Sequence, residues 1–231
     1  MADWISFWDT QHAIYVNARH RDVHYRGIAE DVRRYVPSSD AVVMDYGCGE
    51  ALYAGIVAAA AKRLILVEAA PRIVAGLIAR FAADPKIEVA TPERLEAYPE
   101  SGLDLIVLNS VAQYLSGEAL DALLGRFHRL LKPDGLLVVG DIVPPNVSPL
   151  TDVAALLRLA TRHGFLGAAC AGLVRTLTSD YARLRARLGL ARYDTAAMLD
   201  KLSAAGFSGE RALHNIGHNQ ARMTFVARPL R

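Results

Sequence analysis

The hydrophobic positions of the chain follow two alternating patterns up to about residue 142. Short apolar runs bounded by turn-forming residues predict buried strands at 41–46, 63–67, 86–90, 103–109 and 135–140. Stretches with apolar residues every three or four positions predict helices at 51–61, 71–83 and 117–131. Strands that alternate with helices imply an α/β fold with a parallel sheet and right-handed crossovers.

Helical spacing also dominates both flanks of this alternating region. Ahead of it, the spacing predicts helices at 3–17 and 23–36. Behind it, residues 143–192 exceed the usual connection length, and their helical pattern predicts an insertion. The chain then ends in a predicted helix at 194–205 and two strands on either side of residues 217–219. If the first of these strands is parallel to the sheet, the turn that follows it faces the ligand crevice.

The predicted insertion carries an amphipathic pattern of its own. Tyr181, Leu184 and Leu188 share one stripe of a helix. Its arginines form a solvated helix face or, alternatively, bind an acidic or phosphorylated substrate; they are Arg175, Arg183, Arg185 and Arg187. We interpret the insertion as a lid over a ligand crevice.

Composition narrows the class of protein. The chain has 231 residues, of which 52% are hydrophobic and 22% charged, as expected for one globular domain with a full core. The net charge of +2 does not indicate a nucleic-acid binder, and two cysteines are too few for a disulfide framework. The chain shows no signal-peptide pattern and no apolar stretch of about 18 residues, so we expect a cytoplasmic protein without a membrane span.

The stretch VVMDYGCGEA (42–51) joins the first core strand to its helix. Gly47, Cys48 and Gly49 form the turn, and such turns line the ligand crevice of open α/β sheets. The third glycine of the dinucleotide fingerprint is replaced by Leu52, and no phosphate-binding loop sequence is present. Asp45 would repel a phosphate at this helix N-terminus. A cationic ligand without phosphates, such as S-adenosylmethionine, suits the turn better.

The next strand ends at Glu68, about twenty residues after the glycines, which is the spacing at which an acidic residue binds a ribose. Its carboxylate can accept hydrogen bonds from the 2′- and 3′-hydroxyls. The alternative is a solvated glutamate at a strand end.

Four stretches occur in a fixed order: DYGCGEA (45–51), LVEAA (66–70), DLIVLNSVAQYL (104–115) and LLKPDGLLVVGD (130–141). With them the chain resembles class I S-adenosylmethionine-dependent methyltransferases, well over residues 40–141 and by layout only over 195–228. Ala51 stands where that family often has a third glycine. The resemblance implies a doubly wound, seven-stranded, mostly parallel sheet with an antiparallel last strand, N-terminal helices and a helical lid insertion after strand 5. It also implies a single domain over 1–231, made of cap helices (1–37), a cofactor-binding core (38–142), the insertion (143–192) and a C-terminal helix and hairpin (193–231).

The same resemblance implies a set of residues that bind S-adenosylmethionine and its product S-adenosylhomocysteine. They are Asp45, Gly47, Cys48, Gly49, Glu68, Ala69, Thr91, Pro92, Asn109, Ser110, Val111 and Gln113, joined by Tyr15 and Arg26 from the leading helices. Thr91, Pro92 and Glu93 occupy the position at which the family usually has an adenine-binding acidic or polar residue. Asn109 alternatively caps the following helix.

Four histidines lie in segments that reach the crevice, and they are candidates for a catalytic base: His20, His24, His214 and His218. A base is needed only if the acceptor atom arrives protonated, because the sulfonium is already an activated methyl donor. His20 and His24 are four residues apart, but no glutamate lies between them as a general base and no third ligand is evident, so we expect no metal. A surface or packing role is the alternative for each.

These features predict methyl transfer from S-adenosylmethionine to a small-molecule acceptor by in-line displacement, in a monomer or homodimer. One alternative is a non-catalytic protein that binds S-adenosylmethionine and acts through a partner. A dinucleotide-dependent oxidoreductase is a third reading of the same fold class, which Leu52 and Asp45 disfavour.

Overall fold

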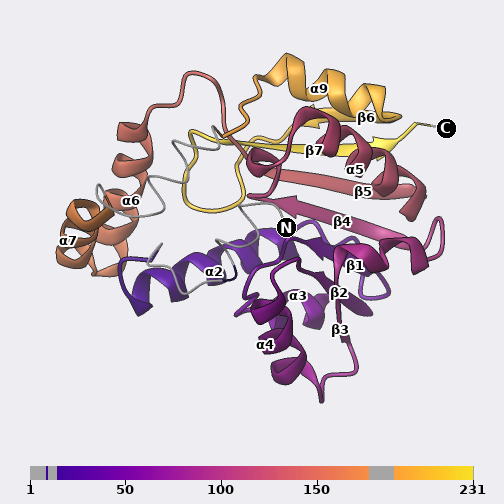
Figure 1. The fold of residues 1–231 in the computed structure, drawn as a ribbon, viewed down its shortest axis with the longest axis horizontal. Helices are drawn as coiled ribbons and strands as arrows, with labels where there is room; N and C mark the ends of the chain where they lie inside the picture. The colour runs from indigo at the N-terminus through magenta and orange to yellow at the C-terminus, as the bar shows by residue number, and fades with distance from the viewer. Residues whose placement is uncertain (1–8, 10–14, 177–189, 231) are drawn as a thin grey trace.

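The structure is a computed structural model, and it describes residues 9, 15–176 and 190–230. Within these residues one sheet contains seven strands in the order β3-β2-β1-β4-β5-β7-β6 (Figure 1). The strands are β1 (Val42–Tyr46), β2 (Arg63–Val67), β3 (Ile87–Ala90), β4 (Leu103–Asn109), β5 (Leu131–Ile142), β6 (Phe207–Arg211) and β7 (Met223–Pro229). The strand order reverses between β1 and β4, and ligands of such sheets bind at this reversal.

The direction of β7 sets the geometry of the C-terminal end. β7 pairs antiparallel with both β5 and β6, whereas β1 to β5 are parallel. β6 therefore runs in the same direction as β1 to β5, and the loop 212–222 after it lies at their carboxyl ends. The predicted mostly parallel sheet with an antiparallel last strand is confirmed.

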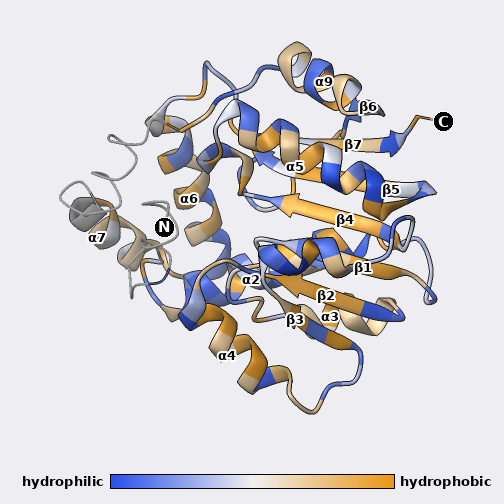
Figure 2. Ribbon diagram, turned by 45° about the vertical axis from the view of Figure 1, so that its right-hand side comes forward, coloured by the Kyte–Doolittle hydropathy of each residue, from blue (hydrophilic) through white to orange (hydrophobic). Residues whose placement is uncertain are grey.

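Helices cover both faces of the sheet, as the predicted doubly wound fold requires. The helices are α2 (Ala18–Arg33), α3 (Ala54–Ala60), α4 (Pro71–Phe81), α5 (Gly117–Leu130), α6 (Pro149–His163), α7 (Leu166–Thr176) and α9 (Thr195–Ala204), with 3-10 turns η1 (Pro92–Ala97) and η2 (Ala112–Tyr114). α5 and α9 bury Phe127 and Leu202 on one face. α2, α3 and α4 bury Val32, Val57 and Leu77 on the other. The strands between them are strongly hydrophobic (Figure 2).

The two helices α6 and α7 form the described part of the predicted insertion. They pack against each other beside the carboxyl ends of the strands, where a small core contains Ala160, Phe165 and Ala169 (Figure 1). Gly164 ends α6 in a left-handed conformation (φ 74°), as glycine commonly does after a helix. The stripe and the arginines at 181–188 lie outside the described residues, as does the side chain of Arg175.

Three predicted boundaries are wrong. α2 begins at Ala18 instead of 23, because the side chain of Asn17 accepts a hydrogen bond from the N–H of His20 and caps the helix earlier. β5 begins at Leu131 instead of 135, with an irregular register at its start. β6 ends at Arg211, so the loop before β7 is longer than predicted. The helix predicted at 3–17 lies mostly outside the described residues.

Candidate functional site

A cavity of about 380 Å³ opens at the carboxyl ends of β1, β2 and β4. This volume lies within the usual range for small-molecule sites. Its floor is the turn after β1, and its roof comes from α2 and from Tyr15, three residues before the start of α2. Among the described residues that line the cavity, three are acidic and none is Lys or Arg; the acidic ones are Asp45, Glu68 and Glu93.

The turn after β1 requires its glycines. Gly47 and Gly49 have φ angles of 73° and 57°, in the left-handed region that glycine adopts at low cost. A Cβ on Gly47 would overlap Cγ2 of Val111, and one on Gly49 would lie 3.1 Å from the Tyr25 hydroxyl. Ala51 also has a positive φ of 41°, although it carries a side chain. The turn therefore keeps bare backbone against the cavity.

Glu68 holds this turn in place from the end of β2. One carboxylate oxygen accepts the N–H of Gly49 (2.9 Å), and the other accepts those of Ala69 (2.7 Å) and Ala70 (2.9 Å). Glu68 is only 7% exposed, so the alternative of a solvated glutamate is wrong. A carboxylate has about four acceptor positions, and one stays available for a hydroxyl in the cavity.

Asp45 lies beside Glu68 at the end of β1. Burial, and secondarily the charge of Glu68, raise the pKa of Asp45 from 3.8 to about 7. A cation in the cavity would favour the ionised form of Asp45, whereas an anion would be repelled by both carboxylates. Burial also raises the pKa of the Cys48 thiol between the two glycines, which fits a small packing residue.

Helix α2 is tied directly to the glycine turn. The Arg21 guanidinium donates two hydrogen bonds to Glu50 (2.6 and 2.5 Å), and the Tyr25 hydroxyl accepts the N–H of Glu50 (3.3 Å). The hydroxyl of Tyr53, the residue before α3, donates to Asp22 on α2. These contacts place the side chains of α2 over the cavity.

Three of the four candidate histidines meet where α2 approaches the loop 212–222. The ring centroids of His20, His24 and His218 lie 6.0–6.3 Å apart, and His20 stacks on Phe165 at 5.4 Å. Burial, and secondarily the charge of His218, lower the pKa of His20 to about 4 and that of His24 to about 3. Burial lowers the pKa of His218 as well. His214 is exposed on the same loop, apart from this cluster.

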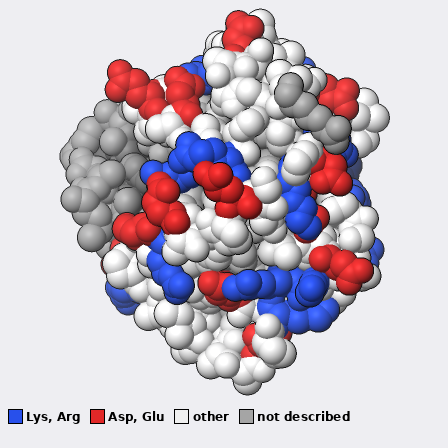
Figure 3. Space-filling model, turned by 90° about the vertical axis from the view of Figure 1, so that its right-hand side faces the viewer, with Lys and Arg blue, Asp and Glu red and all other residues white. Residues whose placement is uncertain are grey.

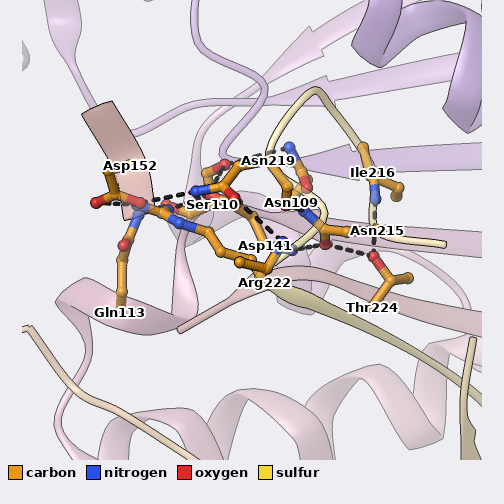
Figure 4. Close-up of polar contacts among 11 residues, drawn as sticks. Asn109, Ser110, Gln113, Asp141, Asp152, Asn215, Ile216, Asn219, Arg222 and Thr224 are labelled. Carbon is orange, nitrogen blue, oxygen red and sulfur yellow. Dashed lines mark hydrogen bonds and ion pairs between the residues drawn. The ribbon is translucent and has the colours of Figure 1, made fainter. Parts of the chain in front are cut away.

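A buried charged network joins the loop 212–222 to the ends of β4 and β5 (Figure 4). Arg222 donates to Asp141 (2.7 Å) and to both oxygens of Asp152 on α6 (3.2 Å), and the Ser110 hydroxyl donates to Asp141 (2.8 Å). Ser110 and Asp141 have φ angles of 61° and 60°, which cost energy in residues with a side chain. Asn219 also donates to Asp152 (2.7 Å), so the network fixes α6 at the crevice.

Most of the predicted cofactor-binding residues line the cavity: Tyr15, Asp45, Gly47, Cys48, Gly49, Glu68, Ala69, Pro92, Asn109, Ser110 and Val111. Three do not. Arg26 is exposed, with its guanidinium 5.0 Å from the ring of Tyr53, and Thr91 precedes η1. Gln113 is buried and donates to the carbonyl of Ser110 (3.1 Å). Asn109 caps no helix, because η2 starts after Val111 without a side-chain cap.

The sequence-based prediction omitted Arg21, Tyr25 and Ile28 from the site. Tyr25 and Ile28 line the cavity, and Arg21 holds Glu50. These residues and Val32 recur at helical spacing, so a helix that starts at Ala18 would have placed them on one face. The acidic partners of Arg222 had no local signal, because they lie far from it in the sequence.

Comparisons with known proteins agree with this geometry. Residues 44–139 match the family model described as a methyltransferase domain. No curated protein matches the chain. Among solved structures, a DhpI–SAH complex has a TM-score of 0.62 at 13% identity, covering 98% of this chain and 95% of that one.

Two further structures are similar over nearly the whole chain. One is Burkholderia thailandensis 1,6-didemethyltoxoflavin-N1-methyltransferase with bound 1,6-didemethyltoxoflavin and S-adenosylhomocysteine, with a TM-score of 0.61, 16% identity and coverage of 99% and 86%. The other is a complex between the Haloferax volcanii Trm112 methyltransferase activator and a putative methyltransferase, with a TM-score of 0.60, 12% identity and coverage of 100% and 99%.

The fold and the matched region define the class of protein. Residues 44–139 are a methyltransferase domain, on a Rossmann-like sheet that extends across the described chain. The chain therefore contains a methyltransferase domain, and its fold is the one found in a methyltransferase with bound S-adenosylhomocysteine. In the part of the chain that the structure describes, no helix could cross a membrane, and no group of His, Cys, Asp or Glu could hold a metal ion.

Proposed function

We propose that the protein transfers the methyl group of S-adenosylmethionine to a small-molecule acceptor. The observation that carries the proposal is the roofed cavity of about 380 Å³ with an acidic lining at the glycine turn. Its size suits a nucleoside ligand together with a small acceptor, and its charge suits a cation. The similar Burkholderia enzyme is a small-molecule methyltransferase by its name, which supports the same substrate class here.

The residues of the cavity fit S-adenosylmethionine. Glu68 has one free acceptor position for a ribose hydroxyl, the bare backbone at Gly47 and Gly49 admits close approach, and Asp45 attracts positive charge. With the ribose at Glu68, we place the adenine beside Pro92 and the methionine portion beside Asn109. When bound, this cofactor supplies a methyl group activated on a sulfonium.

The chain's own residues would then align the acceptor and exclude water. Alignment of two reactants can lower a reaction barrier by roughly 7–11 kcal/mol. In the transfer, an electron pair of the acceptor atom forms the new bond to the methyl carbon, while the pair of the broken C–S bond stays on sulfur. A proton on the acceptor atom leaves to water or to a neutral side chain. His24 lines the cavity, but burial makes it a weak base.

Macromolecular acceptors fit these observations less well. The face shown in Figure 3 mixes basic and acidic side chains, without the continuous basic surface of a nucleic-acid binder. The second candidate function is a non-catalytic protein that acts through a partner; the similarity to a methyltransferase in complex with an activator supports only the binding of a partner protein by this fold. Cytoplasmic location, the single-domain division and a monomeric or homodimeric state remain predictions.

Formation of S-adenosylhomocysteine tests the proposal. Purified protein is incubated with S-adenosylmethionine, with and without a metabolite extract passed through a small-pore filter, and both compounds are quantified by mass spectrometry. We expect product that depends on the extract and is lost in Glu68→Ala. Glu96→Ala, which removes only an exposed ion pair with Arg126, should behave as the wild type. Binding without turnover would favour the non-catalytic function, and absence of binding would reject both.

A further inference from the structure

The cavity has two ends, which the strand order separates. Residues after β2 and β3, such as Glu68 and Pro92, lie on one side of β1, whereas Asn109 and Ser110 after β4 lie on the other. A nucleoside that contacts Glu68 therefore extends away from β4. The methionine portion lies beside Asn109, so the acceptor is left the space between it and the roof of the cavity. The loop 212–222 joins the helices on this side of the fold, because Gly217 donates to Asp31 on α2 and Asn219 donates to Asp152 on α6 (Figure 1).

Rings from the segment 15–25 form part of the roof of the cavity. Tyr15, His24 and Tyr25 all line the cavity, and we name them the aromatic wall. Their ring centroids lie 5.4 Å (Tyr15–His24), 5.6 Å (His24–Tyr25) and 5.8 Å (Tyr15–Tyr25) apart. Such spacings are those of packed aromatic pairs, which present ring faces and edges to a neighbour.

A second layer of rings supports the aromatic wall. His20 lies 5.4 Å from Tyr15 and 6.2 Å from His24, and His218 lies 6.0 Å from His24. Behind them, Phe165 stacks on His20. Because these rings come from α2, from the start of α7 and from the loop 212–222, the wall is fixed by three separate segments.

The aromatic wall carries no charge at neutral pH. Burial holds the pKa of His24 near 3, and burial raises the pKa values of Tyr15 and Tyr25. Two cations of the described residues near the wall are engaged, Arg21 with Glu50 and Arg222 with Asp141 and Asp152. Among the described lining residues there is no cation for a phosphate or a carboxylate of an acceptor.

We propose that the aromatic wall is the acceptor subsite for a planar aromatic or heteroaromatic ring without an anionic group, and that His24 positions this ring through a hydrogen bond to an O–H or N–H on its edge. The proposal rests on the proposed function and specifies its acceptor class. Flat rings gain stacking contacts with Tyr15 and Tyr25, and the imidazole supplies a hydrogen-bond acceptor. His24 is a positioning residue here, because its ring accepts a hydrogen bond without becoming charged.

Binding of three probes to the protein saturated with S-adenosylhomocysteine tests the ring class. The probes are 2-naphthol, its 6-sulfonate, and the non-planar decahydro-2-naphthol, with binding followed by calorimetry. We expect 2-naphthol to bind at least tenfold more tightly than either of the others. Equal binding of all three, preference for the sulfonate, or no binding of 2-naphthol would overturn the proposal. If 2-naphthol does not bind but the protein still binds S-adenosylhomocysteine, the acceptor class is wrong and the proposed function is not affected.

Variants of His24 test its positioning role. His24→Phe should weaken 2-naphthol binding about fivefold, the worth of one hydrogen bond, while leaving naphthalene unchanged within twofold. His24→Gln keeps a neutral acceptor and should restore 2-naphthol binding to within threefold of the wild type. His163→Phe, at an exposed position of α6, is the matched control. Equal losses for 2-naphthol and naphthalene would show a packing role only and would reject the hydrogen bond.

Discussion

Asp45→Asn is the most informative single substitution, because it should stabilise the protein and impair its ligand site at once. Asn has nearly the shape of a protonated aspartate, so the change removes the charge and little else. Asp45 lies at the end of β1 beside Glu68, where burial and this second carboxylate disfavour its ionised form.

The size and sign of the effect follow from the pKa of Asp45. A rise from 3.8 to about 7 means that the folded protein bears a cost of up to about 4 kcal/mol when Asp45 is ionised. The cost is absent below pH 3.8, grows as the pH rises, and is complete above about pH 7. Because water in the cavity screens part of it, we expect Asp45→Asn to stabilise the ligand-free protein by about 2–4 kcal/mol at pH 8.

Urea denaturation of both proteins at pH 5 and pH 8, without ligand, measures this difference. The advantage of Asp45→Asn should be smaller at pH 5 by at least about 1 kcal/mol, because Asp45 is then mostly protonated in the folded protein. Calorimetric titration at pH 8 should show S-adenosylmethionine binding weakened about tenfold, or about 1.4 kcal/mol. A variant that is less stable at pH 8, or an advantage that does not change with pH, would refute the reasoning.

Three further substitutions probe the turn and the charged network. Gly47→Ala should abolish S-adenosylmethionine binding by calorimetry, because its Cβ overlaps Val111, whereas Gly55→Ala in open space on α3 should bind normally. Ala51→Gly should raise the free energy of unfolding by about 1 kcal/mol, since φ is 41° there; a lower melting temperature would contradict this. Arg222→Met leaves two carboxylates without their cation and should lower the free energy of unfolding, measured in urea, by about 3–5 kcal/mol. Lys201→Met, at a pair with an exposed carboxylate, should lower it by less than about 1 kcal/mol. Similar losses for both variants would argue against a tightly held network.

The strands and the glycine turn could be predicted because their signals are local. Buried parallel strands need continuous apolar runs, and β1, β2 and β4 occur within a residue of the predicted positions. The positive φ angles at Gly47 and Gly49 follow from the need for a tight turn between β1 and α3. The seven-stranded, mostly parallel sheet with an antiparallel last strand then followed from the resemblance to a family.

The acceptor end could not be predicted because its residues meet only through the fold. His20, His24 and His218 were named separately, and nothing in their spacing indicated that loop 212–222 would bring His218 beside α2. The start of α2 was misjudged because a cap at Asn17 overrides the apolar periodicity. The partners of Arg222 on β5 and α6 are likewise distant in sequence.

The antiparallel direction of β7 also bears on how such an enzyme can diversify. The residues proposed for the nucleoside lie between positions 45 and 93, whereas the roof of the cavity comes from 15–32 and is supported by Phe165 and by His218 of the loop 212–222. The residues proposed to bind the donor and those proposed to bind the acceptor thus come from separate stretches of the sequence. Natural selection or a chimeric design can exchange the second set for a new specificity while the first continues to hold the same donor.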